Sequence, residues 1–472
     1  MNAKTWIQRR SDLAEMAQGG LLVIPGARNI PMNIPMNHAP FRQTSHMLFL
    51  AGNMPPDSAL IGDPDRDHWE LLVPTPPEGD EIWHGKTPSP HDIAAKVGIL
   101  VVHDTASFKE RVKALAQGRP VWSLPAPDPI WLDRLRDAGI DTPSINGGLP
   151  RLAHNPLADA MIRLRNIKSG AEVAQMQTAA DLTVRVHKAV MAATQAGQTT
   201  EAGLKALVDG MFTAAGCRAA YDPIITVRGD ILHQRAGSAT VQPGQLLLVD
   251  VGAELPSGYC ADVTRTFPVN GVFDDRQRAI YDVVLEAQRV AIEACKPGTR
   301  YSDLHLATSV SLAQGLIDLG ILKGTAEDCV ATDAHALFFP HGLGHLLGLD
   351  VHDLEDLGDR AGYAPGWNRA DRFGLAWLRL DRLLEPGMYV TIEPGLYFIE
   401  ALLQDPEVEA RHKAMVNFDV ARRYLGLGGV RIEDDVLITG DGNRALTANA
   451  PKSRDAIEAL VGSAPGMLAV FG

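Results

Sequence analysis

The stretch VDVGAELPSGYCADVTRTF, residues 249–267, carries two aspartates among Val, Leu, Tyr and Phe. Apolar, β-branched runs at residues 246–251 and 259–267 predict two strands. The turn residues Pro, Ser and Gly at 256–258 lie between them, so the stretch is predicted to form a β-hairpin. Strands of this composition belong in a protein core, where unpaired carboxylates are costly.

The two aspartates, Asp250 and Asp262, are predicted to face each other. With the turn centred near Pro256, each lies six positions from the centre, which places them directly opposite with Cβ atoms about 5 Å apart. Adjacent carboxylates repel each other, and burial adds a desolvation cost. A bound cation removes both penalties, whereas a solvated hairpin tip with two unrelated acids is the alternative.

Two further carboxylates lie inside apolar runs downstream. Glu393 ends the run MYVTIEPG, and Glu433 lies within VRIEDDVLIT. Alternation along a strand sends Glu433 and Arg431 to one face and Asp434 to the other, so Asp434 is expected to be a structural or solvated acid. Glu393 alone would by default face water, but four carboxylates in strand-like apolar runs favour a shared site.

The segment FFPHGLGHLLGLDVHD contains three histidines within twelve positions, His341, His345 and His352. A lone histidine among Leu and Phe is usually a core residue, but three flanked by glycines are unusual. The four carboxylates sum to a charge of −4, which two divalent ions neutralise. With His345 as one neutral nitrogen ligand, this oxygen-rich set suits Mn²⁺, Co²⁺ or Zn²⁺. Two such ions can ionise a bridging water, so amide or ester hydrolysis is the predicted chemistry.

The composition of the whole chain is typical of a globular protein, with 46% hydrophobic and 21% charged residues among 472. This length predicts two domains. The net charge of −13 argues against nucleic acid as a partner. The N-terminus lacks the apolar core of a signal peptide, and no run approaches the ~20 apolar residues of a membrane span. Four dispersed cysteines without a CxxC pair suit reduced thiols, so a cytoplasmic location is expected.

The domain boundary is predicted near residue 157. Residues 1–156 alternate short apolar strands with helical stretches and predict a small α/β domain. In residues 157–472, helices and strands recur twice, which suggests a duplicated α+β unit. Ser169 and Glu172 form a capping box that predicts the start of an amphipathic helix.

These segments, in this order, resemble the pita-bread metallopeptidases, specifically the proline-directed branch of Xaa-Pro dipeptidase (prolidase) and Xaa-Pro aminopeptidase (aminopeptidase P). FRQTSHMLFLAG at 41–52 is similar to the N-terminal domain motif of that branch, and RNIKSGAEVAQM at 165–176 to the start of its catalytic domain. The resemblance covers nearly the whole chain. It implies an RNase-H-like α/β N-terminal domain, followed by the two-fold α+β pita-bread (creatinase/aminopeptidase-like) catalytic domain with a dinuclear metal site.

The resemblance also implies a role for each candidate residue. Asp262 and Glu433 would bridge two divalent ions, with Mn²⁺ expected first and Co²⁺ or Zn²⁺ as alternatives. Asp250 would bind one ion, and His345 and Glu393 the other. A metal-bridging hydroxide would attack the scissile carbonyl carbon, and Glu393 would handle the water proton. His352 would steady the tetrahedral intermediate. His233 and His341 would be the two histidines of the substrate pocket, with His233 counted among the catalytic residues. Tyr397 and Arg431 would lie beside the metals.

One departure from the family pattern concerns the loop at residues 221–233, which is slightly shorter than in typical members. It weakens the assignment of any role to Tyr221 and, to a lesser degree, to His233.

The choice between the two proline peptidases depends on Arg379. Proline removes an amide proton and fixes φ, so ordinary peptidases handle its bond badly. A dipeptidase must also capture the free carboxylate of proline, a task that the arginine fork suits. Arg379, fourteen residues before Glu393, resembles the carboxylate-binding arginine of the larger prolidases, although it could instead be a solvated loop cation. Xaa-Pro dipeptides are therefore the expected substrates, with the aminopeptidase acting on longer peptides as the runner-up.

Two metal-free alternatives fit less well. A peptide-binding module or a creatinase-like hydrolase on the same fold is expected to lack metal ligands, and this chain retains all five. The resemblance further implies a homodimer paired through the N-terminal domain. Short proline-containing peptides are the implied partners, and neither nucleic acid nor a membrane is expected.

Overall fold

The computed structural model describes residues 1–142 and 153–464, which pack as two compact units. The first unit contains Met1–Asn166 and Leu354–Ala361, and the second contains Ile167–Asp353 and the chain from Gly362 onward. Helix α7, Pro156–Asn166, therefore packs with the first unit although it lies beyond the expected boundary at residue 156. None of the described helices is long and apolar enough to cross a membrane.

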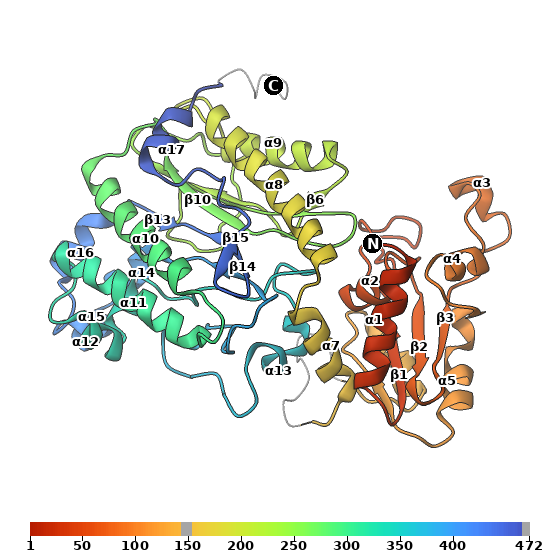
Figure 1. The fold of residues 1–472 in the computed structure, drawn as a ribbon. Coiled ribbons are helices and arrows are strands. Elements are labelled where there is room, and N and C mark those ends of the chain that lie inside the picture. The colour runs from red at the N-terminus through yellow and green to blue at the C-terminus, as the bar shows by residue number, and fades with distance from the viewer. Residues whose placement is uncertain (143–152, 465–472) are drawn as a thin grey trace. The chain divides into compact units, whose positions relative to one another are not determined.

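The first unit is built on a mixed sheet of five strands in the order β4-β3-β2-β1-β5 (Figure 1). Strand β2 runs antiparallel to β1 and β3, whereas the pairs β1–β5 and β3–β4 are parallel. The strands are β1 Leu21–Pro25, β2 Ala59–Asp63, β3 His68–Leu72, β4 Val101–His103 and β5 Val121–Ser123. The helices are α1 Ala3–Met16, α2 Ser45–Ala51, α3 Asp80–His84, α4 Pro90–Lys96, α5 Phe108–Ala116, α6 Pro129–Asp137 and α7. Strand β1 is buried along its whole length, as its apolar run predicts, and Phe108 and Trp131 pack against it.

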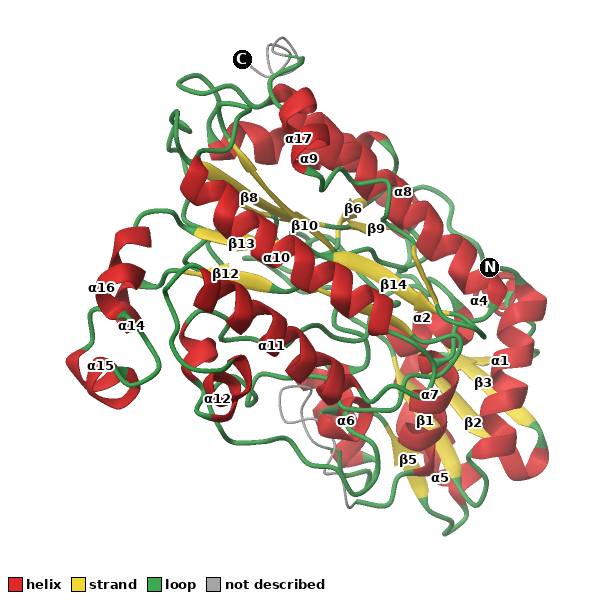
Figure 2. Ribbon diagram, turned by 60° about the vertical axis from the view of Figure 1, so that its left-hand side comes forward, coloured by secondary structure: helices red, strands yellow, loops and turns green. Residues whose placement is uncertain are grey.

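The second unit contains the same arrangement twice: a pair of long helices and a small antiparallel sheet. This agrees with the predicted duplicated α+β unit. Helices α8 and α9 pack together, as do α10 and α11, and Figure 2 shows these long helices running alongside the strands. The sheets are β10-β8-β7 and β11-β14-β15, with the two-stranded pairs β12-β13 and β6-β9. The strands are β6 Arg218–Ala219, β7 Ile224–Thr226, β8 Leu246–Val251, β9 Ala253–Glu254, β10 Val263–Pro268, β11 Tyr389–Ile392, β12 Gly395–Tyr397, β13 Gly429–Arg431, β14 Asp434–Ile438 and β15 Asn443–Ala445.

The first helix of the second unit, α8, begins where the sequence predicts. The capping box of Ser169 and Glu172 is formed, with Ser169 N and Oγ donating to Glu172 Oε2 at 2.9 and 2.7 Å. The helices are α8 Gly170–Ala193, α9 Glu201–Ala214, α10 Asp275–Ala294, α11 Tyr301–Asp318, α12 Ala326–Ala331, α14 Glu400–Leu403, α15 Pro406–His412, α16 Phe418–Ala421 and α17 Arg454–Leu460, and the short α13, Asp359–Gly362, spans the return from the first unit.

The predicted hairpin forms, but its predicted register is wrong. Thr264, not Asp262, lies opposite Asp250. The loop has three residues and ends in Gly258 at φ 89°, which places the centre on Ser257, one residue later than expected. Moving the centre by one residue shifts every pair by two, so Asp262 becomes the diagonal neighbour of Asp250 but stays on the same face.

Strand β10 is hydrogen-bonded to residues 431–433, which end strand β13 and lead into β14. Glu433 N donates to Thr264 O at 3.1 Å. Thr266 Oγ1 accepts from Arg431 N at 3.2 Å and donates to Arg431 O at 3.1 Å. This junction brings the acids of the β8–β10 hairpin against those that flank β11 and β14.

Asp434 lies away from Glu433 and is a structural acid, one of the two roles expected for it. It forms an ion pair with Arg265 at 2.8 Å, with both side chains fully buried, and another with Lys452 at 2.6 Å. Burial alone would raise the pKa of Asp434, but Arg265 and Lys452 hold that pKa at about 2. The pair fixes strand β10 against β14 behind the site.

Candidate metal centre

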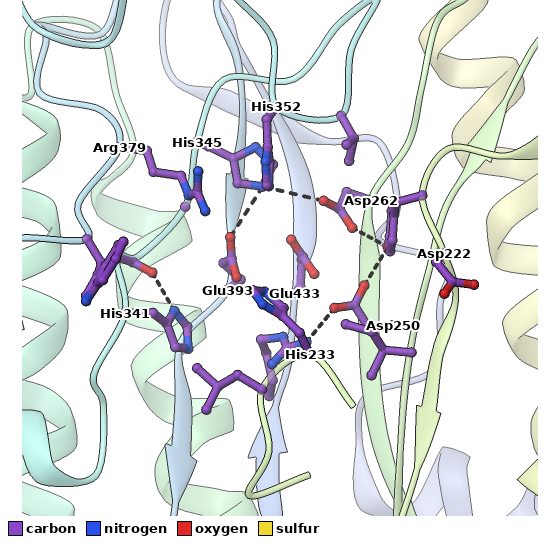
Figure 3. A pocket seen from close by; sticks show the side chains of 18 of the residues that line it. Asp222, His233, Asp250, Asp262, His341, His345, His352, Arg379, Glu393 and Glu433 are labelled. Carbon is purple, nitrogen blue, oxygen red and sulfur yellow. Dashed lines mark hydrogen bonds and ion pairs between the residues drawn. The ribbon is translucent and has the colours of Figure 1, made fainter. Parts of the chain in front are cut away.

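All five predicted metal ligands line one cavity of about 650 Å³ in the second unit (Figure 3). Each carboxylate lies at or beside a strand end, where the backbone ladder stops and a polar side chain can leave the apolar core. The candidates are Asp250 near the end of β8, Asp262 just before β10, Glu393 just after β11, Glu433 just before β14, and His345 from a segment that is hydrogen-bonded to β11.

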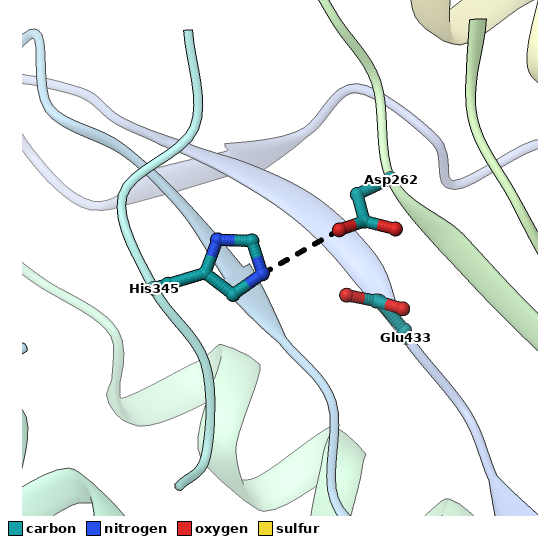
Figure 4. A group of neighbouring side chains, drawn as sticks. All are labelled: Asp262, His345 and Glu433. Atoms are coloured by element: carbon teal, nitrogen blue, oxygen red, sulfur yellow. Dashed lines mark ion pairs between the residues drawn. The ribbon is translucent and has the colours of Figure 1, made fainter. Parts of the chain in front are cut away.

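Asp262, His345 and Glu433 form the tightest group (Figure 4). One ligand atom of each lies within 4.8 Å of the other two, and the residues are 6%, 4% and 2% exposed. Within residues 1–142 and 153–464, no other three such side chains come this close. The separations suit a single cation shared by the three groups.

The tautomer of His345 also suits a metal ligand. Its Nδ1 lies 3.0 Å from the Leu346 carbonyl, and because a carbonyl only accepts, Nδ1 carries the proton. Nε2 then presents a lone pair toward Asp262 Oδ2 at 3.4 Å and Glu393 Oε1 at 3.5 Å. Three electron-rich atoms that point at one another favour a positive charge between them, either a bound cation or a proton.

Burial raises the pKa of three of these carboxyl groups in the absence of a cation. The pKa of Glu433 lies well above its ordinary value, through burial and then the charges of Asp262 and Glu393. Burial also raises the pKa of Asp262, and it raises that of Glu393 to about 7. The donor set therefore fits divalent ions, which would replace the protons that these groups otherwise retain.

Asp250 is held by two buried neighbours. The Tyr221 hydroxyl lies 2.5 Å from Oδ1 of both Asp250 and Asp262, and Arg431 forms an ion pair with Asp250 Oδ2. A hydroxyl donates only one hydrogen bond, so Tyr221 alone cannot satisfy both carboxylates. The guanidinium of Arg431 also adds a positive charge that the sequence-based count of four carboxylates omits.

Tyr221 is the contact that sequence reasoning gave little weight, because its loop is short. The sequence did contain a signal for this contact, because the apolar run IIT begins three residues after Tyr221. This run forms β7 and pairs with β8, so that Ile224 lies opposite Asp250. A strand in that register carries Tyr221 to the edge of the hairpin that bears both aspartates.

A chain of hydrogen bonds continues from Arg431 to the pocket wall. Arg431 Nη1 donates to the Tyr397 hydroxyl at 2.9 Å, and that hydroxyl donates to His341 Nε2 at 2.8 Å. His341 Nδ1 in turn donates to the Gly342 carbonyl at 2.7 Å. Burial lowers the pKa of His341 to about 3, so the ring is neutral. His341 and Arg431 line the cavity, whereas Tyr397 lies behind them.

The remaining predicted residues, His233, His352 and Arg379, also line the cavity. The His352 ring lies against His345, with centroids 4.3 Å apart, and burial lowers the pKa of His352 to about 2. Figure 3 shows Arg379 directed into the cavity beside His345. Lining residues that the sequence did not single out include Asp222, Arg235 and Trp377.

Metal binding at this site is expected to weaken on acidification. The pKa of Glu393 near 7 means that a proton occupies this group of the metal-free site below about pH 7, and the raised pKa values of Glu433 and Asp262 act in the same direction. Each displaced proton should then cost about tenfold in apparent Mn²⁺ affinity per pH unit. Calorimetry in buffers of different ionisation enthalpy would count the protons released. Glu393→Gln should release fewer protons at pH 6.5, and an affinity independent of pH between 5.5 and 8 would contradict the expectation.

Two family models match the chain. The model of metallopeptidase family M24 matches residues 174–440, and the aminopeptidase P N-terminal domain matches residues 6–122. Together they cover both compact units.

Named relatives fall on both sides of the proline-peptidase division. A probable Xaa-Pro aminopeptidase of Fusarium vanettenii is 31% identical over 95% of this chain and 92% of its own length. The human Xaa-Pro dipeptidase is 30% identical over 98% of this chain and 92% of its own length.

Solved structures of aminopeptidases share the whole fold. The Pseudomonas aeruginosa aminopeptidase PepP has a TM-score of 0.81 at 30% identity, covering 98% of this chain and 99% of that one. A zinc-substituted aminopeptidase P of Escherichia coli in complex with product has a TM-score of 0.80 at 29% identity with the same coverage. The expected arrangement of an N-terminal α/β domain and a pita-bread catalytic domain is thereby confirmed.

Proposed function

Because the chain belongs to metallopeptidase family M24 and carries an aminopeptidase P N-terminal domain, we propose that it hydrolyses Xaa-Pro peptide bonds, with Xaa-Pro dipeptides as its preferred substrates. The relatives named as Xaa-Pro aminopeptidases and Xaa-Pro dipeptidase support the bond, since both activities cleave before proline. The observation that carries the dipeptidase assignment is the position of Arg379 in the cavity that holds the metal-ligand candidates.

The proposed metal site uses Asp250, Asp262, His345, Glu393 and Glu433, with Mn²⁺ as the ion and Co²⁺ or Zn²⁺ as alternatives. Bound divalent ions would supply an ionised water as nucleophile and a Lewis acid for the scissile carbonyl. Arg431 and Tyr221 hold Asp250 in place through the contacts described above.

Proton handling falls to side chains that are neutral or near their titration point. Glu393, whose pKa burial raises to about 7 while no cation is bound, is proposed to accept a proton from water and pass it to the leaving amine. His352 is neutral because burial lowers its pKa, and its ring N–H is proposed to donate to the oxyanion of the substrate. His233 and His341 are proposed to contact the substrate from the opposite part of the cavity wall.

Hydrolysis of Ala-Pro and Ala-Pro-Ala with added Mn²⁺ tests the assignment. Cleavage of Ala-Pro in clear preference to Ala-Pro-Ala is the expected result, because the proline carboxylate would end beside Arg379 and a third residue would displace it. Preferential cleavage of the tripeptide would favour the aminopeptidase. Failure to cleave either substrate with the metal site loaded would contradict both activities.

Arg379→Ala is expected to raise KM for Ala-Pro while changing kcat little. Loss of a charge-assisted pair with the carboxylate costs about 1.5–3 kcal/mol, which corresponds to about 10- to 100-fold in KM. The amidated substrate Ala-Pro-NH₂ has no carboxylate, so the variant and the wild type should handle it alike. Arg382→Ala is the matched control, because Arg382 does not line the cavity. Unchanged Ala-Pro kinetics in Arg379→Ala would remove the argument for a dipeptidase.

The aminopeptidase remains the second candidate because the solved structures named above are aminopeptidases with nearly full mutual coverage. The tripeptide arm of the assay is its direct test.

We also propose a cytoplasmic homodimer whose first unit mediates pairing and substrate access, with the division at residues 156 and 157. None of the four cysteines, all of which lie in the described part of the chain, forms a disulfide, which suits a reducing compartment. The first unit exposes apolar side chains such as Ile30 and Met36, at 66% and 73%. Sedimentation analysis of Met36→Lys against the wild type tests the pairing, and a monomeric wild type would contradict it.

A further inference from the structure

Lys168 lies in the segment RNIKSG, to which the proposed reaction gives no role. Its Nζ forms an ion pair with Asp353 Oδ2 at 3.1 Å, and both side chains are only 1% exposed. Burying two charges costs several kcal/mol each, which favourable geometry must offset. The fold keeps this costly ion pair next to the candidate metal centre, which points to a role in holding the surrounding segments in place.

We propose that Lys168 and Asp353 are positioning residues for the metal centre. The pair fixes residues 346–353, the loop that follows His345 and carries His352. It thereby holds the His345 ring with Nε2 directed at the other ligands. This inference deepens the proposed function and rests on it, since it concerns the same metal site.

The link from Asp353 to the ligand passes through one carbonyl. Leu346 O accepts a hydrogen bond from Asp353 N at 2.9 Å and another from His345 Nδ1 at 3.0 Å. The second bond sets the tautomer and the orientation of the ligand ring. Displacing Asp353 therefore moves the acceptor that orients His345.

The carboxylate of Asp353 also forms a hydrogen bond within the loop of residues 346–353. Its Oδ1 accepts from Asp350 N at 3.2 Å. A Cβ at Gly348 would lie 2.4 Å from Asp353 Oδ2, so the loop packs on the carboxylate with no room for a side chain. Gly348 O accepts from Cys260 N at 2.9 Å, which ties the same loop to the hairpin two residues before Asp262.

Lys168 is itself anchored to the sheet that bears Glu433. Its backbone N–H donates to Gly387 O at 2.8 Å, and Gly387 N donates to Ile438 O on strand β14 at 2.9 Å. The cation is thus fixed relative to one group of ligands while it holds Asp353, and through it the His345 loop. The Lys168–Asp353 pair, whose members are 185 positions apart in the chain, thus sets the distance between His345 and the ligand candidates on the β14 side.

Lys168→Met tests the proposal, because it removes the charge while retaining a long, unbranched side chain. We expect Mn²⁺ affinity, measured by calorimetry, to fall about 10- to 100-fold, the usual effect of losing a group that orients a metal ligand. The visible spectrum of the Co²⁺-loaded variant should shift, because the ligand geometry changes. The fall in kcat should exceed any rise in KM, because the substrate contacts at Arg379 remain.

Asp353→Asn is the second variant and decides the matter if Lys168→Met does not fold. Combined with Lys168→Met, it should cost no more Mn²⁺ affinity than the worse single change, because the two side chains act as one unit. Arg119→Met is the matched control, since it removes a cation from the fully buried carboxylate of Asp63 in the first unit. That variant should lose thermal stability and retain wild-type Mn²⁺ affinity.

The outcomes distinguish a failure of the proposed metal site from a failure of the positioning role. A wild-type protein that binds no divalent ion would overturn the proposed metal site itself. A wild type that binds Mn²⁺, with folded Lys168→Met or Asp353→Asn variants that bind it equally well and give an unchanged Co²⁺ spectrum, would overturn the positioning role alone.

Discussion

Asp262→Asn and Glu433→Gln should each lower kcat/KM for Ala-Pro by about 10³-fold or more, since a metal centre contributes several kcal/mol of transition-state stabilisation. Both side chains belong to the tight group with His345. An amide keeps the shape but loses the negative charge, so the cations are less well neutralised. Elemental analysis should find the loss of at least one divalent ion per chain.

The control for these two variants is Asp282→Asn. Asp282 is a half-exposed aspartate of helix α10 that forms an ion pair with Arg454. The control should keep wild-type activity and metal content. If Asp262→Asn and Glu433→Gln also keep full activity and full metal content, the acids do not form the catalytic metal site.

Gly252→Ala should be the most disruptive single methyl group in the site. Gly252 directly follows strand β8 and faces the segment that leads into β10. A Cβ on Gly252 would be 1.8 Å from Ala261 O and 2.7 Å from Ala261 C. Gly252 and Ala261 are buried next to the paired ends of strands β8 and β10, so their backbone atoms cannot move aside locally and Asp262 would be pushed away from Asp250. We expect a loss of about 3 kcal/mol or more in the free energy of unfolding, together with loss of Mn²⁺ binding.

Gly170→Ala provides the control for this prediction. Gly170 is the first residue of helix α8, and no heavy atom lies within 4 Å of a Cβ built on it. Alanine stabilises a helix by up to about 1 kcal/mol relative to glycine, so this variant should be slightly more stable. Denaturant unfolding of both variants measures the difference, and equal stabilities would show that the hairpin tolerates a wider separation.

The chemistry of the site could be predicted because each acid is locally anomalous. Glu433 lies within the run VRIEDDVLIT, whose apolar residues on either side of the three acids predict a buried strand, so its burial could be inferred without knowledge of its neighbours in space. The same reasoning separated Asp434 from Glu433, because alternation along a strand depends only on position in the chain.

The register of the hairpin was predicted less well, for a physical reason. Residues 256–258 were correctly identified as the turn, but their φ and ψ angles decide whether the centre is Pro256 or Ser257. The shift of two residues kept Asp250 and Asp262 on one face and left the chemical interpretation intact.

What the sequence determined by itself is the set of candidate ligands, the helices and strands that carry them, and the family, because residue type and periodicity are local properties of the chain. Only the tertiary structure decided which groups hold those ligands. Tyr221 against two aspartates, Arg431 on Asp250, and Lys168 on Asp353 are contacts between segments far apart in the chain. Such contacts are fixed by the packing of sheets and loops, and no local pattern encodes the distance between two residues that the fold brings together.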